Sequence, residues 1–525
     1  MKKTISRLAL RWVLACAAGM LAMASSARAA TYYVDATAGN DGNSGTSPTA
    51  AWKNAPGMAA YTGGANLVAG DVVYFNSSGT WQVTGTQGIY LTGGVTYIGN
   101  SWGGGSRATL RAAADLASAV VRFRDHATAP TVFKGFDVDA NGKVASGIEM
   151  NHSFYAGPLT GATKRIEDVI VHHVWSRTSQ GQYKYGIILS NHGGSNGEVA
   201  NVEIINSVIH DISRDGLPIY PGDENANCIV RNVVVRGTTV FNTGQDPDYG
   251  AGAGIIVKGR VIDAVIENNF VTATKGAGIF VNSNESNHFG YGPTNIHIRH
   301  NIVNTNTVHG SIRLYDGSSG GDPKDVSIYG NIVYNNTSNG GLLIDSDLRS
   351  SNTLRIYNNT FYNTSVILQG NSATYPVFEF RNNVIHYPAG VPLTEGGKFT
   401  AHSNNLFSGG TTLVRSGGTN YTASSLSSYE PTALSANPQF VNTADLPTGF
   451  VGTYGSNLAP NAGGLALQSG SPAVDRGAAL PAPYTSSVNT VTRPAGSAFD
   501  IGAYELSGSG AAIPLPAPTN LRIIQ

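Results

Sequence analysis

Three nine-residue stretches near the middle of the chain follow one pattern: Asp263-Ala-Val-Ile-Glu-Asn-Asn269-Phe-Val, Asn295-Ile-His-Ile-Arg-His-Asn301-Ile-Val and Asp325-Val-Ser-Ile-Tyr-Gly-Asn331-Ile-Val. Apolar and polar residues alternate in each, and valine and isoleucine dominate the apolar positions, which predicts a short strand. Two further copies carry their asparagine at positions 359 and 383, so the repeat shortens from 32 residues to 24 along the array. Loops of changing length between strands tolerate such variation, whereas closed helical repeats do not.

Weaker copies extend this array toward the N-terminus, at residues 131–138, 168–175, 201–209 and 232–240. A second strand, which opens with a small residue, lies about 15 to 20 residues after each copy. These second strands are Gly186-Ile-Ile-Leu, Gly216-Leu-Pro-Ile, Gly254-Ile-Ile-Val, Gly278-Ile-Phe-Val, Ser311-Ile-Arg-Leu and Gly341-Leu-Leu-Ile. Strands at such spacing stack in parallel, so the sequence predicts an all-β, single-stranded parallel β-helix of about ten coils.

The recurring asparagine has a physical role in that architecture. A side-chain amide that points inward at a bend can bond the backbone of its own turn and the amide of the neighbouring coil, where no water reaches. Isolated Asn-Gly and Asn-Ser pairs are explained by turns alone. Five asparagines at one phase of one repeat predict a buried ladder instead.

The composition narrows the class of function. Thirty-three basic residues are matched by 33 acidic ones, and charged residues make up 13% of the chain. Binding to nucleic acid requires a basic surface, so we expect no nucleic-acid partner. With an exported segment removed, Cys228 is the one cysteine left and lies in an apolar run, which predicts a buried thiol and no intrachain disulfide.

The first thirty residues read as an export signal. A basic start with Lys2, Lys3 and Arg7 precedes an apolar stretch, and Ala27-Arg28-Ala29 supplies small residues at the two cleavage positions. The apolar run is broken by Arg11 and is shorter than the about 20 residues of a membrane span. We therefore expect a signal peptide over residues 1–29, a secreted or periplasmic bacterial protein, and no membrane span.

Both ends of the mature chain resemble a known group of proteins. The start reads Tyr32-Tyr-Val-Asp-Ala-Thr-Ala-Gly-Asn-Asp41-Gly-Asn-Ser-Gly-Thr46-Ser-Pro, with Trp52-Lys53 just after. The end carries Asn437-Pro-Gln-Phe-Val-Asn442, Ser471-Pro-Ala-Val-Asp475-Arg-Gly and Asp500-Ile-Gly-Ala-Tyr-Glu505. These signatures resemble the secreted right-handed parallel β-helix proteins of the pectate-lyase-like superfamily. The resemblance implies a right-handed solenoid, a frame that carries lyases, hydrolases, epimerases and proteins without known catalysis.

The repeats also suggest the domain organisation. Solenoid ends need caps because they expose strand edges and core. We expect a signal peptide (1–29), an N-terminal cap with the first coils (30–128), a regular parallel β-helix (129–388), C-terminal coils with a closing segment (389–506) and a flexible proline-containing tail (507–525).

Alternation places two columns of side chains on the outer face of the glycine-led strands. Within each strand the two apolar residues point inward, so the residues between and after them point outward. One column then reads Ser190, Tyr220, Lys258, Asn282, Tyr315 and Asp345, and the other reads Ile188, Pro218, Ile256, Phe280, Arg313 and Leu343. At about 4.8 Å per coil, the first column spans a few sugar rings, and we expect a polysaccharide partner there.

Cleavage of a uronic-acid polymer by β-elimination needs a base, an acid and a group that neutralises the sugar carboxylate. Lys258 is the candidate base, and the charge of nearby Arg260 favours an unprotonated amine. Tyr220 or Tyr315 can donate the proton, and Asn282 or Arg313 can hold the carboxylate. Phe280, Arg260 and Asp345 complete the expected substrate-binding surface.

A calcium ion would share the neutralising role. Oxygen ligands are offered by Asp215, just before its strand's glycine, and by Asp223, Asp246 and Asp248 in adjoining loops. The terminal signatures are similar to those of calcium-dependent pectate lyases of polysaccharide lyase family 9, which implies a lysine base and several calcium acids. Here only Asp215 matches those acids, and the position of that family's lysine holds Ile256, with Lys258 two residues further on.

Two other functions fit the same residues. A glycoside hydrolase would use two carboxylates about 5 to 9.5 Å apart, drawn from Asp316, Asp345 and Asp347. A noncatalytic surface protein would bind glycans through Tyr220, Phe280, Tyr291 and Tyr315. The paired His172 and His173 lack the spacing of a zinc site, and we interpret them as structural or surface groups.

Overall fold

The computed structural model of the chain describes residues 29–85, 88–116, 119–123, 129–151, 161–175, 184–190, 197–221, 228–246, 252–283, 291–305, 307–315, 323–345, 353–368 and 376–507. The predicted signal peptide and tail lie outside these ranges apart from Ala29 and Ser507. Within the described ranges, no helix has the length and apolar character needed to cross a membrane.

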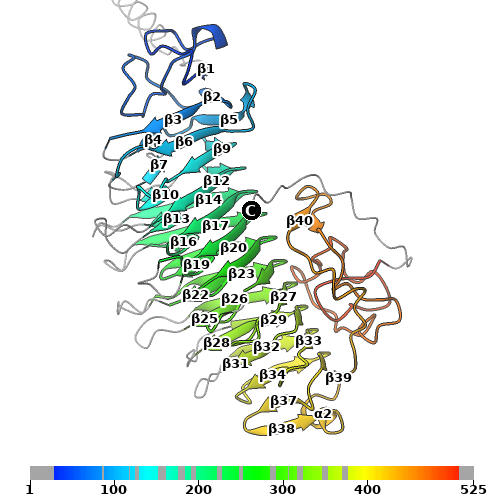
Figure 1. Cartoon of the computed structure of the whole chain (residues 1–525). Coiled ribbons are helices and arrows are strands. Elements are labelled where there is room, and N and C mark those ends of the chain that lie inside the picture. Colours follow the sequence, from blue (N-terminus) through cyan, green and yellow to red (C-terminus); the bar gives the residue numbers. More distant parts are fainter. Residues whose placement is uncertain are drawn as a thin grey trace, which may run out of the picture.

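Three long sheets run the length of the molecule (Figure 1). Sheet A contains β1 (Thr31–Val34), β2 (Val72–Asn76), β5 (Thr96–Trp102), β8 (Thr131–Lys134), β11 (Lys164–Glu167), β14 (Glu198–Ile205), β17 (Ile229–Arg236), β20 (Val261–Glu267), β23 (Thr294–Arg299), β26 (Lys324–Tyr329), β29 (Thr353–Tyr357), β32 (Val377–Arg381) and β35 (Ala401–Ser403). Sheet B contains β3 (Thr80–Val83), β6 (Ala108–Ala112), β9 (Phe136–Asp139), β12 (Ile170–Val174), β15 (Val208–Ile212), β18 (Thr239–Thr243), β21 (Phe270–Thr274), β24 (Ile302–Asn304), β27 (Ile332–Tyr334), β30 (Thr360–Tyr362), β33 (Val384–His386), β36 (Leu406–Ser408) and β39 (Leu434–Ser435). Sheet C contains β4 (Ile89–Leu91), β7 (Ala119–Phe123), β10 (Ser146–Asn151), β13 (Tyr185–Ser190), β16 (Leu217–Tyr220), β19 (Ile255–Lys258), β22 (Ile279–Asn282), β25 (Ile312–Tyr315), β28 (Leu342–Asp345), β31 (Val366–Leu368), β34 (Leu393–Glu395), β37 (Thr412–Ser416) and β38 (Thr419–Thr422).

The order of strands within each sheet confirms the predicted fold, a right-handed parallel β-helix. Each coil adds one strand to each sheet, and neighbouring strands are parallel except for the final antiparallel pair β37–β38. Each sheet has 13 strands, so the molecule has about 13 coils and the predicted number of about ten is wrong. The number was underestimated because the coils before residue 131 lack the nine-residue pattern, so the sequence predicted them only as one block (30–128) and they could not be counted.

Each nine-residue copy is two strands and a corner. The copy that begins at Asp263 contains the end of β20, the corner residues Asn268 and Asn269, and the start of β21. The prediction of one strand per copy is therefore wrong, because alternation alone does not reveal a two-residue bend. The bend is made by Asn268 in the left-handed conformation, with φ of 53°. The glycine-led strands form sheet C, as predicted.

Glycine opens several of the sheet C strands because neighbouring coils approach closely there. A Cβ atom on Gly216 would lie 2.5 Å from a methyl group of Val240 and 2.7 Å from the carbonyl oxygen of Gly254. The equivalent atom on Gly254 would lie 2.5 Å from Val271. These distances leave no room for a side chain, so glycine here marks tight packing of sheet C on sheet B.

The inward residues form one continuous apolar core. Isoleucine, leucine and valine from all three sheets are almost completely buried, including Ile255, Val257 and Ile279 of sheet C. Cys228 is also buried, as predicted, with 2% of its surface exposed. The parallel strands of a solenoid need apolar residues toward the interior of every coil, which explains the strict alternation in the sequence.

The predicted asparagine ladder is confirmed at the corner between sheets A and B. Its five predicted members are completely buried. The side chain of Asn331 is typical: Oδ1 accepts bonds from the backbone N and Nδ2 of Asn301, at 2.9 and 3.0 Å, and Nδ2 donates to Asn359 Oδ1 at 2.9 Å. The same Nδ2 donates to the carbonyl of Ile298, at 2.9 Å.

The ladder differs from the prediction in two respects. The predicted bond to the asparagine's own turn is present at Asn331 and Asn383, but the side chains also bond carbonyls of the preceding coil, as Asn269 Nδ2 does with Val235 O. The ladder also has a sixth buried member, Asn405, and ends on the buried carboxylate of Glu430, which accepts from Asn405 N at 2.8 Å and Nδ2 at 2.9 Å. The acid satisfies the last amide where no further coil follows.

The N-terminal signature builds a cap over the first coil. Trp52 is 1% exposed and stacks on Tyr32, with ring centroids 4.6 Å apart. The carboxylate of Asp41 accepts backbone N–H bonds from Lys53, Asn54 and Thr62, at 2.7 to 3.1 Å. These signature residues therefore hold a loop together, and nothing in their geometry suggests chemistry.

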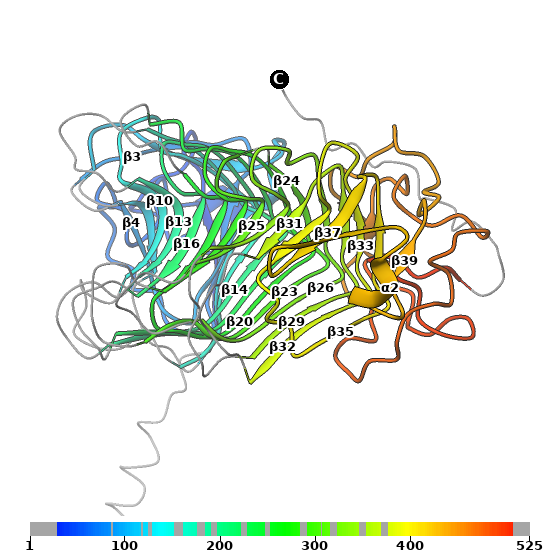
Figure 2. The same cartoon turned by 90° about the horizontal axis from the view of Figure 1, so that it is seen from below.

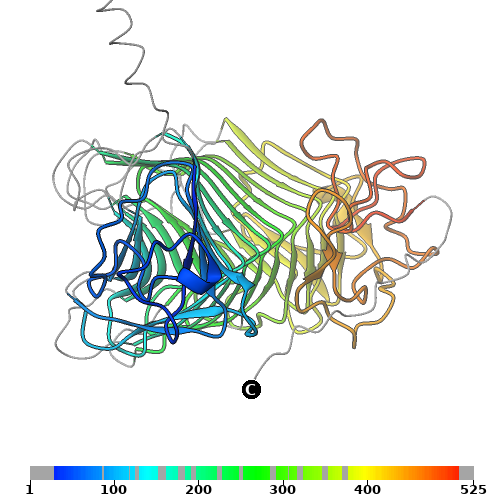
Figure 3. The ribbon, with the colours of Figure 1, turned by 90° about the horizontal axis from the view of Figure 1, so that it is seen from above.

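The segment after β39 packs along the side of the solenoid formed by sheets A and B (Figures 2 and 3). It includes the short pair β40 (Phe450–Val451) and β41 (Ala459–Pro460). Its apolar side chains, such as Leu465 and Ile501, join Ile332 and Val384 of sheet B in a second core. The segment thus covers one flank and leaves sheet C on another side of the molecule (Figure 1).

The C-terminal signature holds this segment in shape. Arg493 is buried and its guanidinium pairs with Glu505 at 2.9 Å and donates to the carbonyls of Asp500 and Gly502. The carboxylate of Asp475 accepts a bond from Ala498 N at 2.9 Å. As at the N-terminus, the signature residues are structural. Among the described residues, the helices are the short η1 (Pro48–Ala50) and α2 (Leu426–Tyr429).

Candidate functional site

The register of sheet C brings the predicted column of side chains together on consecutive coils. Lys258 of β19 is paired with Asn282 of β22, which is paired with Tyr315 of β25. Tyr315 is paired in turn with Asp345 of β28, and Ser190 with Tyr220 on the other side. In the second column, Phe280 is paired with Arg313. Alternation in the sequence therefore placed these residues correctly relative to one another.

Cationic side chains in this part of sheet C lie over aromatic rings. The Nζ atom of Lys258 is 4.9 Å from the ring centroid of Tyr220, one coil away. The guanidinium of Arg313 lies between two rings, 5.1 Å from the centroid of Phe280 and 5.0 Å from that of Tyr315. We call these five residues the cation–aromatic face. All five are partly exposed, so both their charges and their rings are accessible.

A third pair extends this arrangement to the corner between sheets C and A. The guanidinium of Arg260 lies 4.4 Å from the ring centroid of Tyr291, whose side chain is among the most exposed aromatics of the described residues. Gly259 makes this corner possible, because its φ of 73° is left-handed. The pair thus continues the positive charge of Lys258 around the edge of the sheet.

Several residues that point away from the core are nevertheless buried. Asn282, Ser190, Ile188 and Leu343 are all 4% exposed or less. The prediction that the whole of both columns forms outer surface is therefore wrong, since direction on a strand does not fix exposure. The Asn282 side chain would reach a substrate only after rearrangement, and its role in binding stays a prediction.

Asp215 lies at the N-terminal edge of this face and is deeply buried. Its Oδ1 accepts a bond from Ala253 N at 2.9 Å, and its Oδ2 lies 3.4 Å from Arg214 Nε. Burial raises the pKa of the Asp215 carboxyl to about 6, and the nearby charges of Arg214 and Lys258 act in the opposite direction. This carboxyl therefore changes charge close to neutral pH, as a residue in an active site often does.

The surroundings of Asp215 do not fit a calcium ligand. Both oxygens already have protein partners, and the guanidinium of Arg214 occupies the position beside Oδ2. Calcium prefers several ionised or carbonyl oxygens that converge on one point. Asp215 could contribute an oxygen to such a site only if its ion pair with Arg214 were broken. Asp246 is described and is partly exposed, whereas Asp223 and Asp248 lie outside the described residues. The calcium site therefore stays a prediction.

Residues one and two places before the sheet C glycines form a cluster that the sequence did not suggest. Tyr185 forms an isolated parallel bridge with Asp215, and the Arg214 guanidinium lies 5.8 Å from the Tyr185 ring centroid. Lys184 is 1% exposed, and burial lowers the pKa of its amine, an effect that Asp115 and Asp246 partly offset. The signal was present as two successive strand openings, Lys184-Tyr185-Gly and Arg214-Asp215-Gly, but burial could not be read from it.

A buried ion pair lies further along sheet C, toward the N-terminus. Arg122 Nε is 3.2 Å from Glu149 Oε2, and Arg122 Nη1 donates to the hydroxyl of Tyr90 at 3.3 Å. The arginine is 1% exposed and the glutamate 6%. The three residues are paired in register on β4, β7 and β10. The sequence missed this cluster because β7 lacks the opening glycine.

The structure does not describe all candidate acids. Asp316 and Asp347 lie outside the described residues, and so does the side chain of Asp345, so the paired carboxylates of a hydrolase stay a prediction. A cavity of about 390 Å³ lies elsewhere, on the outer face of sheet A, and is lined by Thr96, Val132 and Arg165 among others. One of its lining residues, Arg165, is charged, and none of the predicted site residues lines it.

Comparisons with known proteins agree with the fold. A family model described as "Disaggregatase related" matches residues 199–318, which include the whole cation–aromatic face. No curated protein matches the chain. The chain is a parallel β-helix with structural similarity to pectate lyase Pel9A and other β-helix proteins that act on carbohydrates.

Three solved structures illustrate this similarity. Pectate lyase Pel9A has 15% identity and a TM-score of 0.46, over 91% of this chain and 96% of the other. The A-module of the mannuronan C-5 epimerase AlgE4 from Azotobacter vinelandii has 16% identity and a TM-score of 0.39, over 66% and 79%. PfbA, a surface adhesin of Streptococcus pneumoniae, has 13% identity and a TM-score of 0.39, over 75% and 91%.

Proposed function

We propose that this protein is a secreted polysaccharide lyase that binds a uronic-acid-containing glycan on sheet C and cleaves it by β-elimination. The observation that carries the proposal is the cation–aromatic face, where Lys258 and Arg313 lie over the rings of Tyr220, Phe280 and Tyr315. Aromatic rings offer flat apolar contacts to sugar faces, and lysine and arginine attract the sugar carboxylates. A neutral sugar carries no negative charge that these cationic side chains could attract.

Binding would position the glycan along the solenoid axis. With about 4.8 Å between coils, the four strands β16, β19, β22 and β25 offer contacts to several consecutive sugars. Arg313 is suited to hold a carboxylate, because its planar guanidinium forms two parallel hydrogen bonds. A carboxylate held in this way makes the proton on the adjacent carbon more acidic, which is the first requirement of β-elimination.

The reaction also needs a base and an acid near the held sugar. Lys258 is the proposed base, and it takes the carbon-bound proton in its unprotonated form. Tyr220, in contact with Lys258, is the proposed donor to the leaving glycosidic oxygen. Asp215 acts electrostatically on the same site, because its charge interacts with Lys258.

One observation favours a second function, glycan binding without cleavage. A cation–π contact stabilises the charged ammonium, so the contact of Lys258 with Tyr220 opposes its use as a base. If the amine stays charged, Lys258 binds a second carboxylate alongside Arg313. The protein would then be a glycan-binding surface protein, with the same residues in contact with the same class of polysaccharide.

The deciding experiment incubates the full mature chain with polygalacturonate, alginate and a neutral galactan, with and without added calcium. A lyase releases products with the ultraviolet absorbance of unsaturated uronates, and we expect this from an acidic polymer. New reducing ends without that absorbance would contradict the proposal in favour of hydrolysis. Retention of an acidic polymer without cleavage would support the second function.

Matched variants assign the activity to this face. Lys258→Ala is expected to lower the rate by at least about a hundredfold, whereas Lys324→Ala, a lysine on sheet A, should leave it unchanged. An unaltered rate in Lys258→Ala would show that another group is the base.

A further inference from the structure

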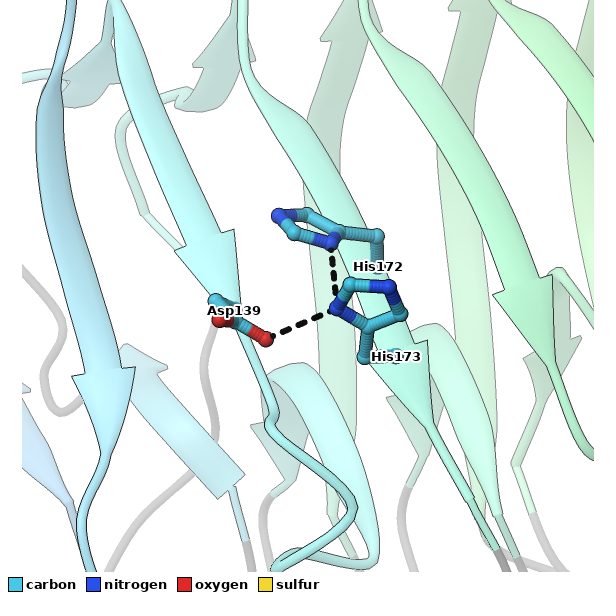
Figure 4. A group of neighbouring side chains, drawn as sticks. All are labelled: Asp139, His172 and His173. Carbon is cyan, nitrogen blue, oxygen red and sulfur yellow. Dashed lines mark hydrogen bonds and ion pairs between the residues drawn. The ribbon is translucent and has the colours of Figure 1, made fainter. Parts of the chain in front are cut away.

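Two histidines and an aspartate come together on the outer face of sheet B, away from the cation–aromatic face of sheet C. Asp139 ends β9, and His172 and His173 lie in β12 of the next coil. The Nδ1 atoms of the two histidines are 2.9 Å apart, and His173 Nδ1 is 3.1 Å from Asp139 Oδ1 (Figure 4). All three ligand atoms lie within 4.8 Å of one another.

The backbone explains why two sequential residues share one face. Neighbours on a regular strand point to opposite sides, but His173 has a left-handed conformation with φ of 55°, which breaks the alternation. Val171 and Val174 are buried, while both histidines between them stay partly exposed. A pattern search that assumes regular strands places these two imidazoles on opposite faces, so the interpretation of both as structural groups overlooked the cluster.

The surrounding residues match the second shell of a metal site. Nε2 of His172 lies 2.7 Å from Asp137 Oδ1, the arrangement in which a metal-binding imidazole donates its other N–H to a carboxylate. Nε of Arg111 lies 3.3 Å from Asp139 Oδ2, and Oδ1 accepts a bond from Asn141 N at 2.8 Å while it faces His173 Nδ1. These contacts orient His172 and Asp139 before any ligand arrives.

The spacing of the ligand atoms suits a first-row transition metal. Nitrogen and oxygen ligands lie about 2.0–2.2 Å from Zn²⁺ in a tetrahedral arrangement, so neighbouring ligand atoms are about 3.3–3.6 Å apart. The separations of 2.9 and 3.1 Å are a few tenths of an ångström shorter, so the ligand atoms need to move apart only slightly. Imidazole nitrogen favours zinc, copper or nickel over calcium and magnesium. The site is also accessible, because the His173 side chain is 45% exposed.

We propose that Asp139, His172 and His173 bind one divalent transition-metal ion, of which Zn²⁺ is the representative, with water in the remaining positions. Binding displaces the proton that His173 Nδ1 shares with its two neighbours, and this proton passes to solvent. The ion joins two consecutive coils. The site lies on a different sheet from the proposed glycan face and does not depend on the proposed function.

The chain offers well-matched variants to test this site. His173→Asn removes a ligand and keeps the left-handed backbone, since Asn242 has the same conformation two coils further on, with φ of 54°. Asp137→Asn removes the second-shell carboxylate only. His210→Gln is the control, because His210 stacks on His172 with ring centroids 5.2 Å apart but bonds Asp211.

The experiment is calorimetric titration of the untagged, chelator-treated mature chain with Zn²⁺, with Co²⁺ absorbance as a second readout. We expect one tight site per chain, at least tenfold weaker in His173→Asn, ten- to a hundredfold weaker in Asp137→Asn and unchanged in His210→Gln. Thermal unfolding midpoints verify that each variant is folded. Absence of a saturable site in the wild type, or equal affinity in His173→Asn, would overturn the proposal.

Discussion

The asparagine ladder and the cation–aromatic face are both columns of side chains that run along the solenoid, yet they differ in almost every other respect. In the ladder the same residue recurs from Asn269 to Asn405, completely buried, and each amide bonds the next. On sheet C the residue changes at every coil, and the rings and charges of Lys258 and Arg313 are partly exposed. Both columns obey the same register.

The difference teaches how to separate support from function in a solenoid. A buried polar group must be satisfied within the protein, and identical groups satisfy each other in an unbroken row. A surface that binds a ligand needs different side chains on successive coils, and these side chains must be exposed to solvent. Repetition therefore indicates structure, while variation at a fixed position of the repeat indicates where to look for chemistry.

The largest effect is expected from an interruption of the ladder. Asn331→Ala removes five buried hydrogen bonds, including those from the backbone N and Nδ2 of Asn301 and those to the carbonyls of Ile298 and Tyr329. Unsatisfied buried polar groups cost about 1–3 kcal/mol each, so we expect a loss of about 3–5 kcal/mol in the free energy of unfolding, measured by urea denaturation.

The control for this variant is an exposed asparagine. Asn295→Gly keeps the left-handed backbone at φ of 57° and removes an exposed bond to Asp263. We expect its stability to change by less than about 1 kcal/mol. Equal losses in both variants would mean that the ladder contributes no more than surface turns do.

The next effect is a pH dependence of stability that comes from Asp215. Burial raises the pKa of its carboxyl from 3.8 to about 6 in the folded protein. Protonated Asp215 therefore stabilises the fold fully below pH 3.8, and this stabilisation is lost as the pH rises through 6. The shift corresponds to about 3 kcal/mol. In Asp215→Asn this loss should vanish, so denaturant melts from pH 4 to 7 should show a flatter stability curve than the wild type.

One result would contradict the prediction for Asp215. A wild-type curve and an Asp215→Asn curve of the same slope would mean that the Asp215 carboxyl is charged throughout that range. The ion pair with Arg214 would then outweigh burial.

A smaller effect is expected on glycan affinity. Arg313→Gln removes the charge that holds the sugar carboxylate, and charged hydrogen bonds contribute about 1.5–3 kcal/mol, so the Kd for the acidic polymer should rise about tenfold or more. Arg355→Gln on sheet A is the control. Isothermal titration with an uncleaved oligouronate, repeated at two salt concentrations, measures both. Unchanged affinity in Arg313→Gln would remove this residue from the site.

The smallest effect concerns the aromatic rings. Phe280→Leu keeps an apolar side chain and removes the ring face beneath Arg313. Cation–π contacts at partly exposed sites contribute about 0.5–1 kcal/mol, so we expect a two- to fivefold rise in Kd in the same titration. A larger loss would mean that Phe280 itself contacts the sugar.

The sequence was informative where one residue type repeats at a fixed phase. It predicted the parallel β-helix, the ladder from Asn269 to Asn383 and the order of side chains on sheet C, because alternation and glycine placement are local. It failed where the backbone is left-handed: Asn268 at a corner and His173 within β12 adopt conformations that the alternation conceals. The prediction therefore merged two strands at Asn268 and missed the cluster around His173.

The sequence also could not predict how deeply each side chain is buried. Asp215 and Lys184 precede sheet C glycines in the same way as exposed residues would, yet both are deeply buried. Exposure depends on how neighbouring coils and loops pack, which no single repeat encodes. The fold was thus largely predictable, while the charge state and accessibility of the candidate site were not.

A crystal structure of the protein with a bound oligouronate tests the central claim most directly. We predict that the sugar rings lie against Phe280 and Tyr315 on sheet C and that a carboxylate contacts Arg313 or Lys258. An oligosaccharide bound instead to sheet A, sheet B or the C-terminal segment would contradict the assignment of sheet C as the functional face.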